Sequence, residues 1–345
     1  MIYLVCQEWK STKGNHAGMK HMCDMICELD NEFKAIVLPE IKLKHNPKNQ
    51  VLRNLNILLF YYSRIYFHNF KTIFNLLKKA KKGDEIILLE YLHKSIRQYV
   101  IAKYLRKFRK GIKISSLQHL TPSVLKSSIP PIRIKKELSY IDKVYTLGTS
   151  LSSYLTEIGI NPNIIRMFPH YVDNVFYHRE KPISQTEDVK IICQGNLQRN
   201  FDLLRTIVDS CPSITFTILA GRNNSISTIF SNCSNVRLLP YLSEEDLRNE
   251  MLNATVSLNV MEDTVGSNVI TTSMAMGHAM IVSDVGSIRD YCTPQNAYFC
   301  KTASDFINAI NNLATDKKQL FQMRVNSLQT SKQFEIGYII EALKK

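Results

Sequence analysis

Several polar residues and glycines stand directly after apolar, strand-like runs, where parallel α/β sheets place their ligands. One is His119, which ends the run that starts at Lys113 and opens the segment His-Leu-Thr-Pro. Ligands of open α/β sheets bind beyond the carboxyl ends of the strands, and a neutral imidazole there could donate a hydrogen bond or handle a proton. We therefore predict a catalytic role for His119, and its position leaves a buried structural histidine as the alternative.

Two further turns combine a glycine with the start of a helix. Gly18 lies between the first strand-like run and an apolar-periodic helix, and Gly195 follows the run Val189–Cys193 and precedes Asn196 and Arg199. A glycine at such a turn lets a ligand approach the amides of the helix N-terminus, and an arginine beside them adds charge for a phosphate. Cations are mildly unfavourable in a first helical turn. Arg199 therefore indicates function rather than helix stability, and we predict that it is catalytic.

The segment Asp263–Ser287 carries the most information. A turn made of Gly266, Ser267 and Asn268 enters a helix that continues with Val269. Small residues at a helix entry keep the first-turn amides open to an anion. We expect an anion site at this helix N-terminus.

The positions of these residues depend on the strands and helices around them. Along the chain, apolar strand-like runs alternate regularly with helical stretches, which is typical of parallel sheets with crossover helices. Six runs fall in each half of the chain, so we predict an α/β fold with two Rossmann-like parallel sheets, and periodicity alone leaves one long (β/α)₈ barrel open. The predicted strands are Ile2–Cys6, Ala35–Leu38, Glu85–Glu90, Ile112–Leu117, Lys143–Thr146 and Ile164–Met167, then Val189–Cys193, Thr215–Ala220, Val236–Leu238, Thr255–Leu258, Ala279–Ser283 and Tyr298–Cys300. The expected domains are 1–176 and 189–330, joined by a polar linker at 177–188 and followed by the segment 331–345.

Length and composition set wider limits. The chain has 345 residues, of which 45% are hydrophobic and 21% charged, as in ordinary globular proteins of about two domains. Its eight cysteines include no C-x-x-C pair, so we expect reduced thiols in a cytoplasmic protein. The most apolar stretch is broken at Ser63 and Arg64, before the ~18–20 residues that a membrane span needs. We expect neither a span nor a cleaved signal peptide.

Several common sites have no motif in this sequence. G-x-G-x-x-G, Walker A, H-E-x-x-H and D-x-D are all absent. The dehydrogenase, P-loop and zinc-hydrolase classes therefore have no support, and a sugar transferase that chelates a metal through D-x-D is disfavoured. We predict no metal site.

The positive charge is concentrated in one segment. Residues 41–113 hold eighteen Lys+Arg and three acidic residues, a local balance of +15 in a chain whose net charge is +14. Interleaved aromatic residues favour an anionic membrane surface, and a solvated surface or a nucleic acid partner are alternatives, the last of them without a motif. The predicted surface residues are Lys78, Lys79, Lys81, Lys82, Arg106, Lys107, Arg109 and Lys110.

The segment Asp263–Ser287 resembles the retaining glycosyltransferases of family four, which have a GT-B fold. Asn268-Val269, Met274-Ala275, Gly277 and Asp284-Val285-Gly286 match the family's Asn-Val, Glu-Ala-Met-Ala-x-Gly and Asp-Val-Gly-Gly patterns. Gly195-Asn196-Leu197 with Arg199 resembles its Gly-Arg-Leu…Lys-Gly-x-Asp-Leu-Leu. Pro169–Phe176 and Asp142–Ser150 resemble its interdomain segment and last N-domain strand.

The resemblance implies a hexosyltransferase-type enzyme that uses a nucleotide-sugar as co-substrate, without a metal or other cofactor, and retains the anomeric configuration. It also implies two domains facing across a cleft, with 331–345 as a helix that crosses back. The donor diphosphate would bind at Ser267, Asn268 and Val269 with Arg199, and His119 and Gly18 would face the donor sugar. The other donor-binding residues implied are Asn196, Gly221, Tyr241, Thr264, Gly266 and Thr272.

The chain departs from the family at three positions. The family's two glutamates, eight residues apart, fall here at Thr264 and Thr272, and its Gly-Arg-Leu arginine falls at Asn196. A threonine hydroxyl can hydrogen-bond a ribose or phosphate oxygen but carries no charge. A catalytically inactive GT-B partner subunit that binds a nucleotide or glycan therefore remains an alternative, as does a nucleotide-sugar epimerase.

Acceptors usually bind the N-terminal domain of such enzymes. Its basic, aromatic segment therefore suggests a lipid-linked or membrane-associated glycan acceptor, as in bacterial capsule or O-antigen assembly. We expect a cytoplasmic protein bound peripherally at the inner face of the cytoplasmic membrane.

Overall fold

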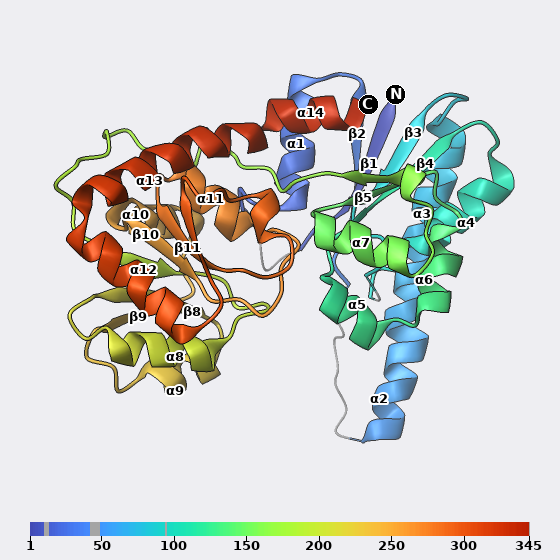
Figure 1. The fold of residues 1–345 in the computed structure, drawn as a ribbon. Helices are drawn as coiled ribbons and strands as arrows, with labels where there is room; N and C mark the ends of the chain where they lie inside the picture. Colours follow the sequence, from blue (N-terminus) through green and yellow to red (C-terminus); the bar gives the residue numbers. More distant parts are fainter. Residues whose placement is uncertain (10–13, 42–48, 94, 345) are drawn as a thin grey trace. The chain divides into compact units, whose positions relative to one another are not determined.

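The computed structural model describes residues 1–9, 14–41, 49–93 and 95–344, which form two compact α/β units (Figure 1). The first unit comprises Met1–Leu147 and Leu151–Phe168, and the second comprises Gly148–Ser150 and Pro169–Lys345. Each unit has one parallel sheet of six strands. Two separate sheets confirm the predicted fold class and exclude a single barrel.

The first sheet has the strand order β2-β1-β3-β4-β5-β6. Its strands are β1 (Ile2–Gln7), β2 (Phe33–Leu38), β3 (Glu85–Leu88), β4 (Lys113–Gln118), β5 (Lys143–Thr146) and β6 (Ile165–Met167). The helices are α1 (Met19–Leu29), α2 (Gln50–Asn56), η2 (Ile57–Tyr62), α3 (Ser63–Lys79), α4 (Tyr99–Phe108), α5 (Pro122–Ser128), α6 (Pro131–Leu138), α7 (Thr149–Glu157) and η3 (Pro162–Ile164). The order reverses between β1 and β3, which makes the carboxyl ends of these two strands the switch point where ligands of such sheets bind.

The second sheet has the order β12-β11-β10-β7-β8-β9, and its switch point lies between β7 and β10. Its strands are β7 (Ile191–Cys193), β8 (Phe216–Gly221), β9 (Val236–Pro240), β10 (Val256–Asn259), β11 (Ala279–Ser283) and β12 (Ala297–Cys300). The helices are α8 (Phe201–Ser210), α9 (Asn224–Phe230), α10 (Glu244–Asn253), α11 (Asn268–Ala275), η4 (Ile288–Asp290), α12 (Ala303–Thr315), α13 (Lys317–Ser331), η5 (Lys332–Phe334) and α14 (Ile336–Lys344).

The central strands are apolar because helices cover them. Leu4 and Val5 of β1 are fully buried, and Leu4 pairs with Ala35 on one side and Ile87 on the other. A strand buried on both faces has no polar face to expose, which gives the continuous apolar runs seen in the sequence. This pattern is why all twelve predicted strands are present.

The chain enters the second unit earlier than the predicted linker. Pro169–Phe176, which the sequence placed in the first domain, lies with the second unit. There the Val172 N–H donates to the Phe334 carbonyl oxygen at 2.8 Å, and the His170 N–H donates to the Tyr291 hydroxyl at 3.0 Å. Within the predicted segment 331–345 the chain forms η5 and α14, and Lys345 lies outside the described residues.

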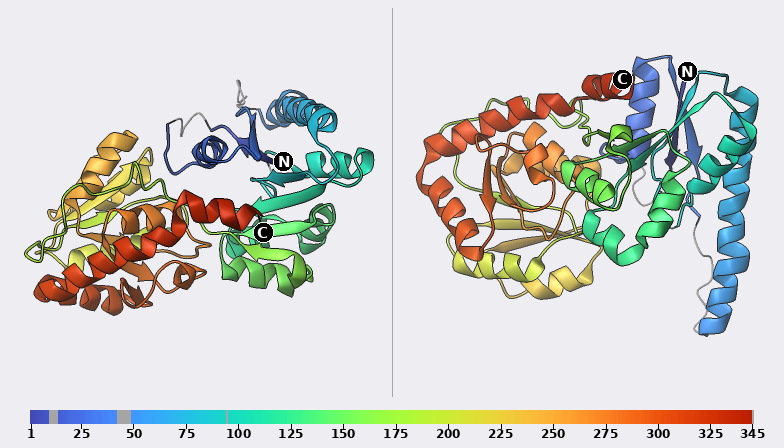
Figure 2. Two further views of the ribbon diagram at one scale, coloured as in Figure 1. Left: turned by 90° about the horizontal axis from the view of Figure 1, so that it is seen from above. Right: turned by 45° about the vertical axis from the view of Figure 1, so that its right-hand side comes forward.

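One long helix dominates the basic segment. α2, η2 and α3 follow one another without a break from Gln50 to Lys79, with a π-helical stretch in the middle (Figures 1 and 2). None of the residues in α2 and η2 is fully buried. The predicted basic segment 41–113 also includes residues 42–48 and 94, which lie outside the described part of the chain.

Candidate functional site

In the second unit, the loops after β7 and β10 are joined at the switch point. Gly195 has φ = +83°, and Arg199 forms an isolated antiparallel bridge with Met261. The Asn200 N–H donates to the Val260 carbonyl oxygen at 3.1 Å, and the Glu262 N–H to the Gln198 carbonyl oxygen at 3.0 Å. These bonds hold Arg199 at the carboxyl edge of the sheet.

The guanidinium group of Arg199 lies over Gly195. A Cβ atom on Gly195 would lie 2.9 Å from Arg199 Nη2 and 3.4 Å from the Val269 Cγ2 methyl group of α11. Arg199 Nε and Nη1 are buried and have no hydrogen-bond partner among the described residues. Burial lowers the pKa of Arg199 to about 10, so the group still carries its charge at neutral pH. A buried cation with unmet donors is costly unless an anion binds to it.

The first turn of α11 offers further donors. Ser267 is the N-cap residue in extended conformation, and its side chain does not cap the helix. Its buried hydroxyl has no hydrogen-bond partner among the described residues. First-turn amides have no partner within a helix and attract anions. Arg199 and Ser267 therefore provide unmet donors next to a helix N-terminus, as a phosphate group requires.

The glycine before this turn cannot be replaced without a clash. Gly266 has φ = +95°, and a Cβ atom there would lie 2.1 Å from Cζ of the Tyr291 ring. That ring is itself fixed, because it stacks on Phe334 at 5.2 Å between centroids. The close packing of Gly266 on Tyr291 positions Ser267 at the helix entry.

Three of the predicted donor-binding residues, Asn196, Gly221 and Tyr241, lie at the ends of β7, β8 and β9. Asn196 Nδ2 donates to the Ala220 carbonyl oxygen at 3.4 Å, and a Cβ atom on Gly221 would lie 3.1 Å from that nitrogen. The guanidinium carbon of Arg222 lies 4.3 Å from the ring centroid of Tyr241. Asn196 is close to Gly221, and Tyr241 is close to the neighbouring Arg222.

Thr264 and Thr272 use their hydroxyls locally. The Gly266 N–H donates to Thr264 Oγ1 at 3.0 Å, and Thr272 Oγ1 donates to the Asn268 carbonyl oxygen at 2.7 Å. Both side chains are 4% exposed. Such bonds to the local backbone are common for threonine. Each hydroxyl is therefore engaged by its own loop or helix, and neither supplies a negative charge.

In the first unit, His119 lies directly after β4. Its Nε2 donates to the Leu89 carbonyl oxygen at 2.6 Å, and burial lowers its pKa to about 4, so the ring is neutral at pH 7. Together with Trp9, Glu90 and His93 it lines a cavity of about 170 Å³. This environment suits a hydrogen-bonding histidine and equally a structural one.

Gly18 lines a neighbouring cavity of about 250 Å³, which shares Trp9 and Met19 with the cavity of His119. It is the N-cap residue of α1. A Cβ atom on Gly18 would lie 3.2 Å from the Asn15 carbonyl oxygen. The tight turn thus favours glycine at this position.

Glu90 is a candidate that the sequence analysis missed. It follows β3 directly, is 7% exposed and lines the cavity of His119. Its carboxyl group accepts from the Gln7 N–H and from Gln98 Nε2, each at 3.3 Å. Burial nevertheless raises its pKa to about 8. A polar residue after a strand was the available signal, but the prediction counted Glu90 as part of the strand.

The predicted basic surface divides into two groups. Lys78, Lys79, Lys81, Lys82, Lys107 and Lys110 are exposed. Arg106 and Arg109 are half-buried: Arg106 Nε donates to the Tyr140 carbonyl oxygen at 3.0 Å, and Arg109 Nη2 donates to that of Ala80. These two arginines hold the ends of helices together. In the part of the chain that the structure describes, no helix is long and apolar enough to cross a bilayer.

Comparisons with known proteins agree with this architecture. Residues 188–316 match the family model described as Glycosyl transferases group 1, and no curated protein matches the chain in sequence. Alr3699/HepE of Anabaena in complex with UDP-glucose is 10% identical, with a TM-score of 0.71 over 99% of this chain and 98% of that chain. The sucrose-phosphate synthase tll1590 from Thermosynechococcus elongatus is 12% identical, with a TM-score of 0.74 over 100% and 98%.

A third solved structure is the lipopolysaccharide outer core galactosyltransferase WaaB in its apo form. It is 15% identical, with a TM-score of 0.68 over 100% of this chain and 98% of that chain. These likenesses establish the fold, which is GT-B.

Proposed function

We propose that the chain is a GT-B glycosyltransferase, since it has the GT-B fold and its residues 188–316 match the family model described as Glycosyl transferases group 1, as the sequence motifs predicted. It transfers a sugar from a nucleotide-sugar donor to a lipid-linked or membrane-associated glycan. The process is bacterial surface polysaccharide synthesis, of the capsule or O-antigen kind, at the inner face of the cytoplasmic membrane. Transfer proceeds with retention and without a metal.

The observation that carries this proposal is that two residues beside α11, Arg199 and Ser267, have unmet donors. Arg199 Nε and Nη1 and the Ser267 hydroxyl are buried without partners among the described residues. The diphosphate of a nucleotide-sugar would pair with them and with the first-turn amides. As the bond to the sugar breaks, negative charge grows on that diphosphate, and fixed donors stabilise it in the way that a metal does in D-x-D enzymes.

The bound ligands of similar structures support a uridine donor. The HepE structures are complexes with UDP, with UDP-glucose, and with UDP and glucose. WaaB is a galactosyltransferase of the lipopolysaccharide outer core. We therefore place UDP-hexoses first among the candidate donors.

The test is a panel of UDP-, GDP-, dTDP-, ADP- and CMP-sugars, scored by thermal shift and by nucleotide release with and without EDTA. We expect one donor to stabilise the protein and to be turned over equally well in EDTA. Arg199→Ala should lower turnover by about 100-fold or more, since a single charge-stabilising donor is worth that much. Arg205→Ala is the matched control, because Arg205 lies on α8 and pairs with Asp209. Equal turnover of both variants would refute the role of Arg199.

Thr264 and Thr272 favour one alternative, a partner subunit that binds a nucleotide or glycan without catalysis. Both hydroxyls already bond to the local backbone, and both positions lack a carboxylate. The same panel separates the two functions. A donor that stabilises the fold and is never consumed, even with acceptor-rich membrane extracts, would indicate the partner subunit.

Membrane association is supported by an exposed stripe along the long helix. Phe60, Phe67 and Phe74 recur every seven residues and are 61%, 65% and 62% exposed. Each is followed four residues later by an exposed basic residue, and the three basic residues are Arg64, Lys71 and Lys78. In the α-helical part, α3, residues four and seven apart share a helix face, which places Phe67, Lys71, Phe74 and Lys78 together. We call these six residues the Phe–basic stripe, and its chemistry suits the interface of an anionic bilayer.

A further inference from the structure

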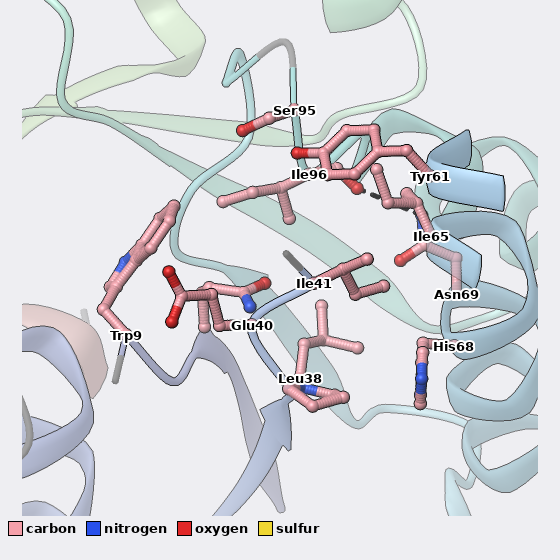
Figure 3. A pocket seen from close by; sticks show the side chains of 12 residues that line it. Trp9, Leu38, Glu40, Ile41, Tyr61, Ile65, His68, Asn69, Ser95 and Ile96 are labelled. Carbon is pink, nitrogen blue, oxygen red and sulfur yellow. Dashed lines mark hydrogen bonds between the residues drawn. The ribbon is translucent and has the colours of Figure 1, made fainter. Parts of the chain in front are cut away.

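A third cavity of the first unit lies at the carboxyl edge of its sheet. It has a volume of about 180 Å³ and lies between the ends of β1 and β2, the helix α3 and the loop before α4 (Figure 3). The side chains that shape it include Trp9, Glu40, Tyr61, His68 and Ser95. It shares Trp9 with the cavity of His119 but has its own walls.

The wall formed by the long helix is held rigidly. Asn69 is 2% exposed, and its Nδ2 donates to the carbonyl oxygens of Ile96 and Arg97 at 3.2 and 3.3 Å. Arg97 has φ = +55°, and its guanidinium carbon lies 3.8 Å from the ring centroid of Tyr62. The same residue bonds the Tyr66 hydroxyl. The cavity is therefore preformed, which lowers the entropy cost of binding.

The lining combines aromatic faces with hydroxyl partners. The indole of Trp9 and the phenol of Tyr61 stand on opposite sides of the cavity (Figure 3). The Glu40 carboxylate and the Ser95 hydroxyl line the same cavity (Figure 3). An aromatic face packs against the C–H face of a sugar ring, while carboxylate and hydroxyl oxygens pair with its hydroxyl groups.

Charge excludes a phosphate as the occupant. Residues 41–113 hold eighteen Lys+Arg, yet none of the described lining residues is a lysine or arginine. Glu40 is the acidic residue of the lining, and burial together with Lys71 and Arg64 lowers the pKa of His68, which favours its neutral form. Among the described lining residues, an anion would meet a carboxylate and neither a lysine nor an arginine. A neutral polyhydroxyl ligand meets matching groups.

The size and position of the cavity narrow the choice of ligand further. About 180 Å³ is small beside the ~300–1,000 Å³ of sites that enclose a drug-sized ligand, so one ring is the appropriate occupant. Tyr61, Ile65 and His68 line the cavity, while Phe60 and Phe67 of the same helix belong to the exposed Phe–basic stripe. A ligand in this cavity would lie next to any bilayer that the stripe contacts.

We propose that this cavity binds one neutral pyranose of the acceptor glycan, with Trp9 as the stacking face and Glu40 as the hydroxyl partner. The proposal rests on the proposed function, because an acceptor is meaningful only for a transferase. It adds the chemical class of the acceptor unit and the residues that select it.

Trp9 makes the test direct, because it is the single tryptophan of the chain. The full-length protein is titrated with the methyl glycosides of glucose, galactose, mannose and N-acetylglucosamine, and tryptophan emission is recorded. We expect a saturable change with at least one of them. Glu40→Gln should weaken it about tenfold or more, as the loss of hydrogen bonds to a charged group predicts.

Glu8→Gln is the matched control, since Glu8 adjoins Trp9 in sequence, has the same charge and lines the cavity of Gly18 instead. Tyr61→Ala provides a second variant, which should also weaken binding. The proposal is overturned if no glycoside gives a saturable change, if Glu8→Gln and Glu40→Gln act equally, or if inorganic phosphate reproduces the change.

The donor panel on the same preparation separates this proposal from the proposed function. Glu40→Gln should leave the donor-induced thermal shift unchanged, because Glu40 lines neither the cavity of His119 nor that of Gly18, and Arg199 and Ser267 belong to the second unit. Glycoside binding without any donor effect would refute the transferase and leave a sugar-binding cavity. Donor turnover without glycoside binding would refute the cavity alone.

Discussion

Glu90 shows how burial sets the protonation state of one residue. It is 7% exposed, and although two N–H groups donate to it, burial raises its pKa from 4.5 to about 8. The loss of hydration therefore outweighs the two hydrogen bonds. At neutral pH the carboxyl group is largely protonated and can donate a hydrogen bond into the cavity of His119.

This pKa predicts a pH-dependent stability. Between about pH 4.5 and 8 the unfolded chain releases the Glu90 proton while the folded chain keeps it, so the free energy of unfolding falls as pH rises. Each pH unit is worth about 1.4 kcal/mol in that window. Glu90→Gln removes this term, and we expect its melting temperature to rise relative to the unmodified protein as pH increases.

The measurement is thermal unfolding from about pH 5 to pH 8, with the exposed Glu32→Gln as control. His93 and His119 line the same cavity, and their titration is common to both proteins, so it largely cancels in the difference. Parallel melting curves for Glu90→Gln and the unmodified protein would contradict the assignment.

At the scale of elements, the strands could be predicted and the long helix only in part. The strands are short apolar runs because both faces of each sheet are covered, and this pattern is readable in sequence. The π-helical stretch Ile57–Tyr62 and the packing of α3 on the loop at Ile96 depend on contacts between distant residues. No local pattern encodes them.

The same limit applied to the candidate site. Gly195 and Arg199 were found because a glycine and a cation are visible at a predicted turn. The expected place of Arg199 in the first helical turn was wrong, because α8 begins at Phe201 with Asn200 as its N-cap. The cavity between Trp9 and Tyr61 was missed because its residues come from four separate segments that only the fold brings together. The local hydrogen bonds of Thr264 and Thr272 could not be predicted either, because they depend on the side-chain rotamers.

The link between α3 and the loop before α4 predicts a stability effect. Asn69→Ala leaves the carbonyl oxygens of Ile96 and Arg97 without their buried donor. We expect a loss of about 1–3 kcal/mol in urea unfolding, the usual cost of unpaired buried groups. Asn75→Ala, on the same helix and half-buried, is the control. Equal losses from both variants would mean that the bond contributes nothing specific.

At the scale of the whole molecule, one segment carries the charge. Outside 41–113 the chain is close to neutral, since its net charge is +14 and the segment holds +15. We therefore expect full-length protein to sediment with vesicles that contain anionic lipid, and binding to fall as salt rises. Replacing Phe60, Phe67 and Phe74 by serine should reduce vesicle binding at least tenfold, since each substitution removes apolar area that the bilayer would bury.

A charge-matched pair of variants separates location from total charge. The first replaces Lys78, Lys79, Lys81 and Lys82 by glutamine, and the second replaces Lys301, Lys317, Lys318 and Lys332, which are exposed in the second unit. Only the first should weaken vesicle binding. Equal weakening by both would indicate a general effect of net charge and no membrane face on the first unit.

Trp9 has a consequence beyond any single ligand. Its indole belongs to the walls of three cavities, which contain Glu40, His119 and Gly18 respectively. Any ligand that turns or pins this ring reshapes the neighbouring walls at the same time. By thermodynamic reciprocity, whatever factor one ligand imposes on the affinity of a second, the second imposes on the first. A ligand that moves the indole in one cavity would therefore change the affinity of the neighbouring cavities, by the same factor in both directions.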